Sequence, residues 1–385
     1  MPGYELIDNQ EFKQVSEIFK KSKTLFRMGF DKTRKNVFKV EDFENNFAKK
    51  LKSNYALAVT SGTAALRTGL AALELKEGDE VITQSFTFVA TVEAIVESRA
   101  VPVCTEIDES LNMDPDDLLK KINKKTKAVI VVHMLGVPAR IDKIKKICQK
   151  YNLALIEDTA WGCGAKFRQK YLGTWGDIGA FSFDFAKTIT TGEGGMLLFK
   201  SKEKFLKAKA WHDHGHENNP KVPRWEDTRK SSGFNFRMTE MQGAVGLAQL
   251  KKLDLIVKNQ RKNHDKIWKK IKYISNIKKR EYPEGSKISA DALIIIVKSA
   301  KIAKKCRNEL LKCGISTKIL PEAYTWHFAA TWRHIKPLIK TKKKLNNSFP
   351  ISKKILSRCV SIPIFVKMKK STPDKIFKAM KKSVT

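Results

Sequence analysis

Residues 55–75, Y-A-L-A-V-T-S-G-T-A-A-L-R-T-G-L-A-A-L-E-L, contain the pattern that decides the fold. The short apolar run Tyr55–Val59 predicts a buried strand. Ser61-Gly62-Thr63 follows it, and the alanine- and leucine-rich stretch Ala64–Leu75 then predicts a helix. A strand that leads directly into a helix is the building unit of α/β folds.

The same alternation continues to about residue 200. We expect further strands at Glu80–Ile82, Val101–Ile107, Lys127–His133, Leu153–Glu157, Ile178–Phe183 and Met196–Phe199. We expect the intervening helices at Phe88–Glu97, Asp116–Ile122 and Ile141–Tyr151. This order predicts an α/β fold with a mostly parallel sheet, in which ligands bind beyond the carboxyl ends of the strands.

The pattern changes after about residue 240. A long helix is predicted from Thr239 to about Lys272, and a smaller α+β pattern follows it. Its expected elements are strands Ala290–Val297, Ser316–Leu320 and Cys359–Pro363, and helices Ile302–Cys313 and Pro373–Lys382. We therefore predict a large domain over residues 1–255, which includes an N-terminal segment 1–30, and a small C-terminal domain over residues 256–385.

Net charge is the unusual feature of the composition. The 385 residues include 75 Lys and Arg against 40 Asp and Glu, for a net charge of +35, and a 42% hydrophobic content excludes a disordered chain. Residues 251–385 contain 36 of the basic and 8 of the acidic residues, so this part carries +28 and the rest +7. A solvated lysine-rich surface explains this excess. Nucleic-acid or membrane binding is the alternative, but no zinc-finger, RNP or basic-region pattern supports it.

The cysteines and the start of the chain indicate a cellular setting. The six cysteines form no C-x-x-C pair, and their spacing fits no zinc or haem pattern. Met1–Glu5 lacks the charged and apolar regions of a signal peptide, and the apolar run Ala292–Val297 is too short to span a bilayer. We expect a cytoplasmic protein without structural disulfides, metal or membrane contact.

Two candidate site features could bind a phosphate or a charged ring. Ser61-Gly62-Thr63 lies between a strand and a helix, where backbone N–H groups can hold a phosphate, although a plain helix cap has the same sequence. Glu157-Asp158 ends an apolar strand, where a carboxylate faces either a ligand or the start of the next helix.

Two further features lie near strand ends and glycines. Lys187 follows a strand and precedes the glycine-rich run 188–195, where partial burial would lower its pKa and suit it to Schiff-base chemistry. In a chain with 75 basic residues this position alone proves little. The run 233–242, G-F-N-F-R-M-T-E-M-Q, precedes the long helix and could equally be a capping loop.

Taken together, these features resemble the DegT/DnrJ/EryC1/StrS family of sugar aminotransferases. The resemblance rests on six motifs in order: S-G-T-A-A-L at 61–66, F-T-F-V-A-T at 86–91, E-D at 157–158, G-D-I-G-A-F-S-F at 176–183, K-T-I-T-T-G-E-G-G at 187–195 and G-F-N-F-R-M-T-E at 233–240. It is dense over about residues 35–255. It implies the fold-type-I architecture of enzymes that use pyridoxal 5′-phosphate.

The resemblance also assigns roles to residues. It implies that Lys187 bonds to the cofactor and moves a proton, and that Asp158 keeps the pyridine nitrogen protonated. The other implied cofactor-binding residues are Gly62, Thr63 and Ser182 for the phosphate, Phe88 for stacking on the ring, and Asn235, which reaches the cofactor of a neighbouring subunit. These roles imply a homodimer with shared sites, an amino-acid donor such as L-glutamate and a keto-sugar acceptor.

One residue departs from the family pattern. Three residues after the aspartate, where the family has Gln or His, this chain has Trp161. Trp161 either replaces that contact by its shape or moves the substrate, and ordinary packing is the alternative. A branch of the family with His in place of the lysine catalyses dehydration, so the retained Lys187 favours transamination over a sugar dehydratase.

A closer resemblance concerns the acceptor. Met1–Gly3, residues 182–190, 213–216 and 326–335 are similar to the branch that makes 8-amino-3,8-dideoxy-octulosonate for lipopolysaccharide. The acceptor of that branch carries a carboxylate, for which we name His214, His216, His327 and Arg27 as candidate partners. Surface or packing roles remain open for these residues.

Overall fold

The computed structural model describes residues 2–219, 221–322, 324–340, 345 and 348–384. Within these ranges, seven strands form the main sheet in the order β1-β9-β8-β5-β4-β2-β3. They are β1 (Tyr55–Val59), β2 (Glu80–Gln84), β3 (Val101–Thr105), β4 (Thr126–Val132), β5 (Ala154–Asp158), β8 (Ile178–Ser182) and β9 (Gly195–Phe199). The ladders from β3 to β8 are parallel, and β9 runs antiparallel to both β8 and β1. The predicted α/β fold with a mostly parallel sheet is confirmed.

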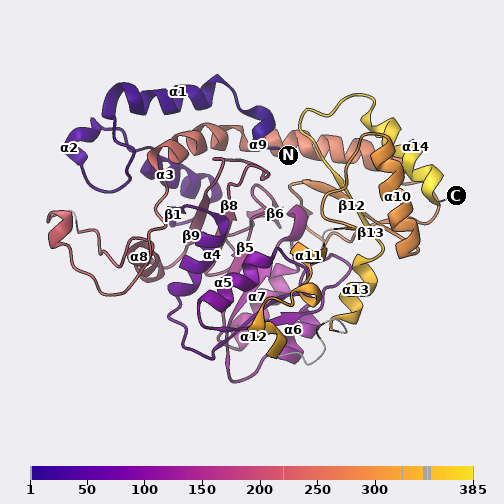
Figure 1. Ribbon diagram of the computed structural model, residues 1–385, viewed down its shortest axis with the longest axis horizontal. Coiled ribbons are helices and arrows are strands. Elements are labelled where there is room, and N and C mark those ends of the chain that lie inside the picture. Colours follow the sequence, from indigo (N-terminus) through magenta and orange to yellow (C-terminus); the bar gives the residue numbers. More distant parts are fainter. Residues whose placement is uncertain (1, 220, 323, 341–344, 346–347, 385) are drawn as a thin grey trace.

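Helices cover both faces of this sheet (Figure 1). One face packs against α4 (Gly62–Ala71), α5 (Val89–Glu97) and α8 (Lys202–Trp211), and the other against α3 (Lys39–Leu51), α6 (Pro115–Lys121), α7 (Ile141–Lys150) and α9 (Glu240–Ile271). Successive strand residues alternate between the faces. Leu57 and Val59 thus join the cluster of α4, whereas Ala56 and Ala58 join that of α3 and α9.

The long helix α9 joins the two parts of the chain. Thr239 caps its N-terminus in a reciprocal arrangement with Gln242, and the helix continues without a break through residue 255. The N-terminal helix α1 (Asn9–Glu17) lies along α9, where Glu11 accepts hydrogen bonds from Gln249 and Lys252. A short helix α2 (Asp31–Arg34) follows α1. The division of the chain at residue 255 stays a prediction, since it falls inside a continuous helix.

The C-terminal part builds a second, antiparallel sheet. Its strands are β10 (Ile277–Lys279), β12 (Ala292–Val297) and β13 (Cys359–Pro363), and α10 (Ala300–Lys312) and α14 (Thr372–Val384) cover it. These positions confirm the predicted strands and helices of this part, apart from one. The remaining elements are α11 (Tyr324–His327), α12 (Lys336–Lys340), α13 (Pro350–Leu356) and the short strands β6 (Lys166–Phe167), β7 (Lys170–Tyr171) and β11 (Ser286–Lys287).

The predicted strand Ser316–Leu320 is wrong. Lys318 N–H does donate to Ser361 of β13, but Ile319 has a φ of +75° and the N–H of Leu320 turns back to the carbonyl of Lys318. This tight turn interrupts the ladder, so the segment stays irregular. The apolar pattern predicted a strand because side-chain type alone does not reveal a positive φ.

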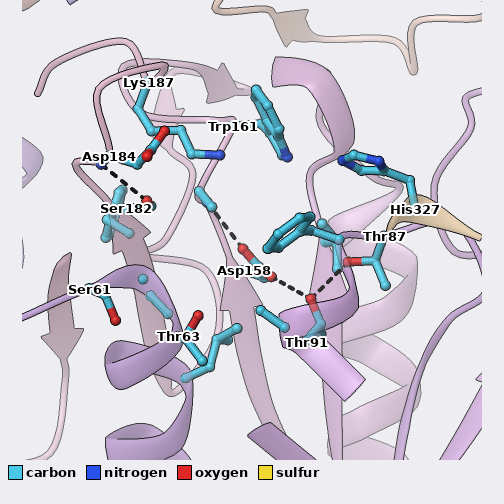
Figure 2. A pocket seen from close by; sticks show the side chains of 18 of the residues that line it. Ser61, Thr63, Thr87, Thr91, Asp158, Trp161, Ser182, Asp184, Lys187 and His327 are labelled. Atoms are coloured by element: carbon cyan, nitrogen blue, oxygen red, sulfur yellow. Dashed lines mark hydrogen bonds between the residues drawn. The ribbon is translucent and has the colours of Figure 1, made fainter. Parts of the chain in front are cut away.

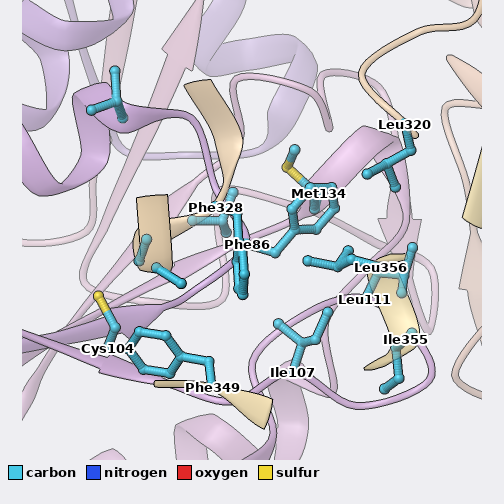
Figure 3. Packing of buried hydrophobic residues seen from close by; sticks show 14 of the residues in the cluster. Phe86, Cys104, Ile107, Leu111, Met134, Leu320, Phe328, Phe349, Ile355 and Leu356 are labelled. Carbon is cyan, nitrogen blue, oxygen red and sulfur yellow. The ribbon is translucent and has the colours of Figure 1, made fainter. Parts of the chain in front are cut away.

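A shared hydrophobic core ties the C-terminal part to the main sheet (Figure 3). Side chains from both parts interleave in it; those labelled are Phe86, Cys104, Ile107, Leu111, Met134, Leu320, Phe328, Phe349, Ile355 and Leu356. Leu320, Phe328, Phe349, Ile355 and Leu356 are therefore fixed against the sheet that carries the predicted site. In the described part of the chain, no helix has the length and apolar character needed to cross a membrane.

Candidate active site

A cavity of about 360 Å³ opens beyond the carboxyl ends of β5 and β8 (Figure 2). That volume lies within the range of small-molecule sites, roughly 300–1,000 Å³. Of the eight residues that the sequence analysis names for the cofactor site, seven line it: Gly62, Thr63, Phe88, Asp158, Trp161, Ser182 and Lys187. The sheet topology thus brings together residues from separate parts of the chain at one edge.

The N-terminus of α4 forms one wall of the cavity. Ser61 caps this helix and its Oγ accepts from the N–H of Ala64, so both sequence interpretations of Ser61-Gly62-Thr63 are compatible: cap and binding loop. The N–H groups of Gly62 and Thr63 lie in the first turn, where no intrahelical acceptor exists. A Cβ on Gly62 would lie 2.7 Å from Cβ of Ser182, so only glycine permits this close approach. The result is a cradle of donors suited to an anion.

Asp158 forms the floor of the cavity and is almost fully buried. Its carboxylate accepts from Thr91 Oγ1 at 2.9 Å and from the N–H of Ala160 at 3.1 Å, and Thr87 hydrogen-bonds to Thr91 at 2.8 Å (Figure 2). Burial raises the pKa of Asp158 above its ordinary value, although these hydrogen bonds oppose the shift. A cation bound against this carboxyl would restore its ionised form.

The adjacent Glu157 has a different task. It is fully buried and accepts from the N–H groups of Gly173, Trp175 and Gly176 at 2.6–2.9 Å, and it pairs with His133. Burial acts to raise the pKa of Glu157, but these donors outweigh it and hold the pKa below its ordinary value. Of the Glu157-Asp158 pair, only Asp158 lines the cavity, and Glu157 fixes the loop before β8.

Lys187 lies in the loop between β8 and β9, and its amine points to Trp161 (Figure 2). Its Nζ is 3.4 Å from the centroid of the indole ring. Burial and, second, the ammonium group of Lys318 lower the pKa of Lys187 to about 8. A lysine with this pKa holds a larger neutral fraction near pH 7 than an exposed one, and the neutral amine is the nucleophile.

Aromatic groups close the side of the cavity opposite α4. Phe88 is 38% exposed, and Trp326 stacks on it with 5.9 Å between ring centroids and 6° between planes. The ring of His327 is 5.4 Å from that of Phe88 and also lines the cavity. Trp326 and His327 come from α11, so the C-terminal part supplies some of the wall.

Asn235 lies outside the cavity. It is exposed on the loop before α9, where its side chain accepts from the N–H of Arg237 at 3.4 Å. Since the resemblance assigned Asn235 to the cofactor of a neighbouring subunit, this placement in one chain leaves that role a prediction.

The four candidate partners of an acceptor carboxylate are dispersed. His327 lines the cavity, whereas Arg27 is paired with Glu44 at 2.6 Å in a separate hollow. His216 is paired with Asp227 at 3.1 Å, and His214 is exposed in a loop. Within the described ranges, no group of three His, Cys, Asp or Glu side chains is placed to hold a metal ion.

Sequence reasoning did not find several residues of this site. Thr87 and Thr91 lie within the quoted motif 86–91, but the sequence did not show that Thr91 donates to the aspartate or that Thr87 bonds to Thr91. Asp291 and Lys318 gave no signal. Both come from the C-terminal part, outside the six motifs, and the sequence does not distinguish Lys318 from the many other lysines there.

Comparison with known proteins identifies this arrangement. The model of the DegT/DnrJ/EryC1/StrS aminotransferase family matches residues 15–381. The chain belongs to this family. It is 36% identical over 295 residues to the GDP-perosamine synthase of Escherichia coli O157:H7, an alignment that covers 75% of this chain and 77% of that protein.

Two solved structures show the same architecture over almost the whole chain. The Helicobacter pylori aminotransferase PseC, which is involved in the biosynthesis of pseudoaminic acid, superposes with a TM-score of 0.86 at 25% identity, covering 98% of this chain and 97% of that one. A GDP-4-keto-6-deoxymannose-3-dehydratase with bound GDP-perosamine gives a TM-score of 0.83 at 25% identity, covering 97% and 98%. The protein is a pyridoxal 5′-phosphate-dependent sugar aminotransferase with the fold-type-I architecture.

The residues of the cavity fit this cofactor. The amides at the start of α4, with Ser182 beside Gly62, match the charge of its phosphate. The buried Asp158 matches a protonated pyridine nitrogen, and the amine of Lys187 matches its aldehyde. The phosphate, the ring nitrogen and the aldehyde of the cofactor therefore each have a matching group in the cavity.

Proposed function

We propose that this aminotransferase moves the amino group of L-glutamate to 8-oxo-3,8-dideoxy-octulosonate, in the cytoplasm, for the synthesis of a cell-surface polysaccharide. The observation that carries the reaction type is the amine of Lys187 in a cavity whose floor is the carboxyl of Asp158. The acceptor is proposed from the resemblance of residues 182–190, 213–216 and 326–335 to the octulosonate branch.

The residues of the cavity divide the chemistry between them. Pyridoxal 5′-phosphate, when bound, supplies an electron sink that stabilises negative charge at the Cα of the donor. Lys187 would hold the cofactor through its Nζ, and the same amine would carry the proton that leaves the Cα of the donor. Asp158 keeps the proton on the pyridine nitrogen, and Thr91 and Ala160 hold its carboxylate in place by hydrogen bonds.

The remaining proposed roles concern binding. Gly62 and Thr63 donate backbone N–H groups to the phosphate, and Ser182 adds its hydroxyl. Phe88 and Trp161 pack against the cofactor ring. Their side chains exclude water from the reacting carbon. His327 offers a donor to the carboxylate of the acceptor from the opposite wall.

We also propose a homodimer in which Asn235 of the partner subunit completes each site. Its exposure outside the cavity of its own chain supports this role. Mixing inactive Lys187→Ala and weakened Asn235→Ala proteins under exchange conditions tests it, because a mixed dimer has one complete site. Activity should recover on mixing, and no recovery with proven subunit exchange would contradict shared sites.

The experiment that tests the reaction has two steps. Borohydride treatment of the cofactor-loaded protein should fix the cofactor to the peptide that contains Lys187, and mass spectrometry identifies that peptide. A panel of amino acids and keto-sugars then identifies donor and acceptor, with L-glutamate and the octulosonate derivative expected to give the fastest turnover. Absence of an adduct on Lys187 would refute the assigned role.

A sugar dehydratase is the second candidate function, because one such enzyme shares the fold. The two reactions differ in stoichiometry. Transamination consumes one donor molecule for each amino-sugar formed, whereas dehydration releases a deoxy-keto-sugar without an amino group. Retention of Lys187 favours transamination.

A further inference from the structure

A second lysine lies beside the reacting lysine. The Nζ of Lys318 is 4.7 Å from the centroid of the Trp161 ring, and the Nζ of Lys187 is 3.4 Å from the same centroid. The two amines therefore share one indole ring. The side chain of Lys318 is 14% exposed, so water screens little of its charge.

Asp291 fixes Lys318 in this position. Its two carboxylate oxygens accept hydrogen bonds from Nζ of Lys318 at 2.7 and 2.6 Å, and its side chain is 2% exposed. The backbone holds both residues as well, since Lys318 N–H donates to Ser361 and Ile364 N–H donates to Asp291. Charge-assisted hydrogen bonds of this kind set geometry as well as energy.

The backbone next to Lys318 is strained. Ile319 is β-branched and has a φ of +75°, a conformation that such residues rarely adopt. This turn puts Ile319 on the wall of the cavity while Lys318 lies beside Trp161. Strain of this kind concentrates at functional sites, where the surrounding structure maintains it.

We propose that Lys318, held by Asp291, is a positioning residue that makes the amine of Lys187 easier to deprotonate. An indole ring by itself favours a protonated amine over its face. Two ammonium groups on one ring repel each other, and the carboxylate of Asp291 accepts hydrogen bonds from Lys318. The charge of Lys318 therefore disfavours a proton on the amine of Lys187.

The other groups around Lys187 set the size of this effect. Burial lowers the pKa of Lys187 most, and Lys318 comes second. Three carboxylates raise it: Asp291 before β12, Asp184 in the loop of Lys187 itself and Asp158 at the end of β5. Removal of the Lys318 charge should therefore raise the pKa of Lys187, because the three carboxylates would then be opposed by burial alone.

The test measures Lys187 directly in the cofactor-free protein. Trace acetylation over pH 6–11, read by mass spectrometry at the Lys187 peptide, gives the pH at which half of the amine is reactive. In Lys318→Met this midpoint should rise by about one pH unit, which is about a tenfold loss of labelling at pH 7. Lys318→Arg keeps the charge and should keep the midpoint, as should Lys304→Met on the exposed face of α10.

In Lys318→Met, the buried carboxylate of Asp291 loses its partner, which could itself change the midpoint or the folding. A double variant, Lys318→Met with Asp291→Asn, removes this unpaired charge. Its midpoint should lie between those of the wild type and Lys318→Met, because Lys318 affects Lys187 more than Asp291 does. An unchanged midpoint in Lys318→Met, or a full return to the wild-type midpoint in the double variant, would overturn the proposal.

This inference rests on the proposed role of Lys187, but the two fail separately. Acetylation reports the amine of Lys187 whether or not it bonds to the cofactor, and borohydride trapping reports the bond whether or not Lys318 matters.

Discussion

Residues 55–200 carry the reacting lysine in a cavity at the edge of the main sheet, whereas residues 251–385 carry most of the positive charge on exposed surfaces. In the first region, burial lowers the pKa of Lys187, whose amine lies in the cavity, to about 8. In the second, lysines such as Lys301, Lys304 and Lys375 point into solvent. The comparison teaches that chemistry follows from the loss of water around one lysine, and that the number of lysines says little about it.

Removal of the buried amine should have the largest effect. Lys187→Ala deletes the amine that we propose bonds to the cofactor and carries the proton, so turnover should fall about 10⁴-fold or more. Steady-state assay of amino-sugar formation measures this loss. Lys304→Ala, an exposed lysine of α10, is the matched control and should retain wild-type turnover. An equal loss of turnover in both variants would show that the buried lysine is no more important for the reaction than an exposed one.

The two neighbouring carboxyls at the end of β5 should behave differently. Asp158→Asn cannot keep a proton on the pyridine nitrogen, and turnover should fall by about 10²-fold or more with little change in melting temperature. Glu157→Gln places an amide N–H₂ against backbone donors and should lower the melting temperature. Scanning calorimetry and a turnover assay on both variants test this division, and interchanged results would refute it.

The glycine at the start of α4 should affect cofactor affinity. In Gly62→Ala the new Cβ would meet Ser182 at 2.7 Å, so that the cradle must open and affinity should fall about tenfold. Absorbance titration of the cofactor-free protein measures the Kd. Gly69→Ala in the same helix meets the flexible end of Leu197 at 3.3 Å and should leave the Kd unchanged. A similar Kd for all three proteins would show that α4 does not bind the phosphate.

The smallest effect is expected from the charged surface. A variant with glutamine at five exposed lysines loses five positive charges from the solvent-exposed surface. The lysines are Lys301, Lys304, Lys305, Lys375 and Lys378. Its kcat should stay within about twofold of the wild type, since solvent and salt screen exposed charges. A large fall in kcat, or salt-sensitive DNA binding that the substitutions abolish, would show that this surface has a function of its own.

The sequence could predict most of the fold because its signals are local. The apolar strands, the following helices and the cap Thr239 of α9 are each specified by neighbouring residues. Several helices, among them α1, α3 and α8, were not predicted, although the spacing of Val40, Phe43, Phe47 and Leu51 in α3 is helical. The strand at 316–320 was predicted wrongly, because the positive φ of Ile319 depends on its packing and not on its type.

By itself, the sequence determined the α/β order, the family and the cavity residues Lys187, Asp158 and Gly62, because these lie in motifs at the ends of successive strands. Only the tertiary structure decided that Glu157 fixes the loop before β8, and which C-terminal residues reach the cavity. Lys318 was indistinguishable among 75 basic residues until the fold buried it against Asp291 and Trp161. The physical reason is that desolvation and charge pairing act through space, between residues that no local pattern connects.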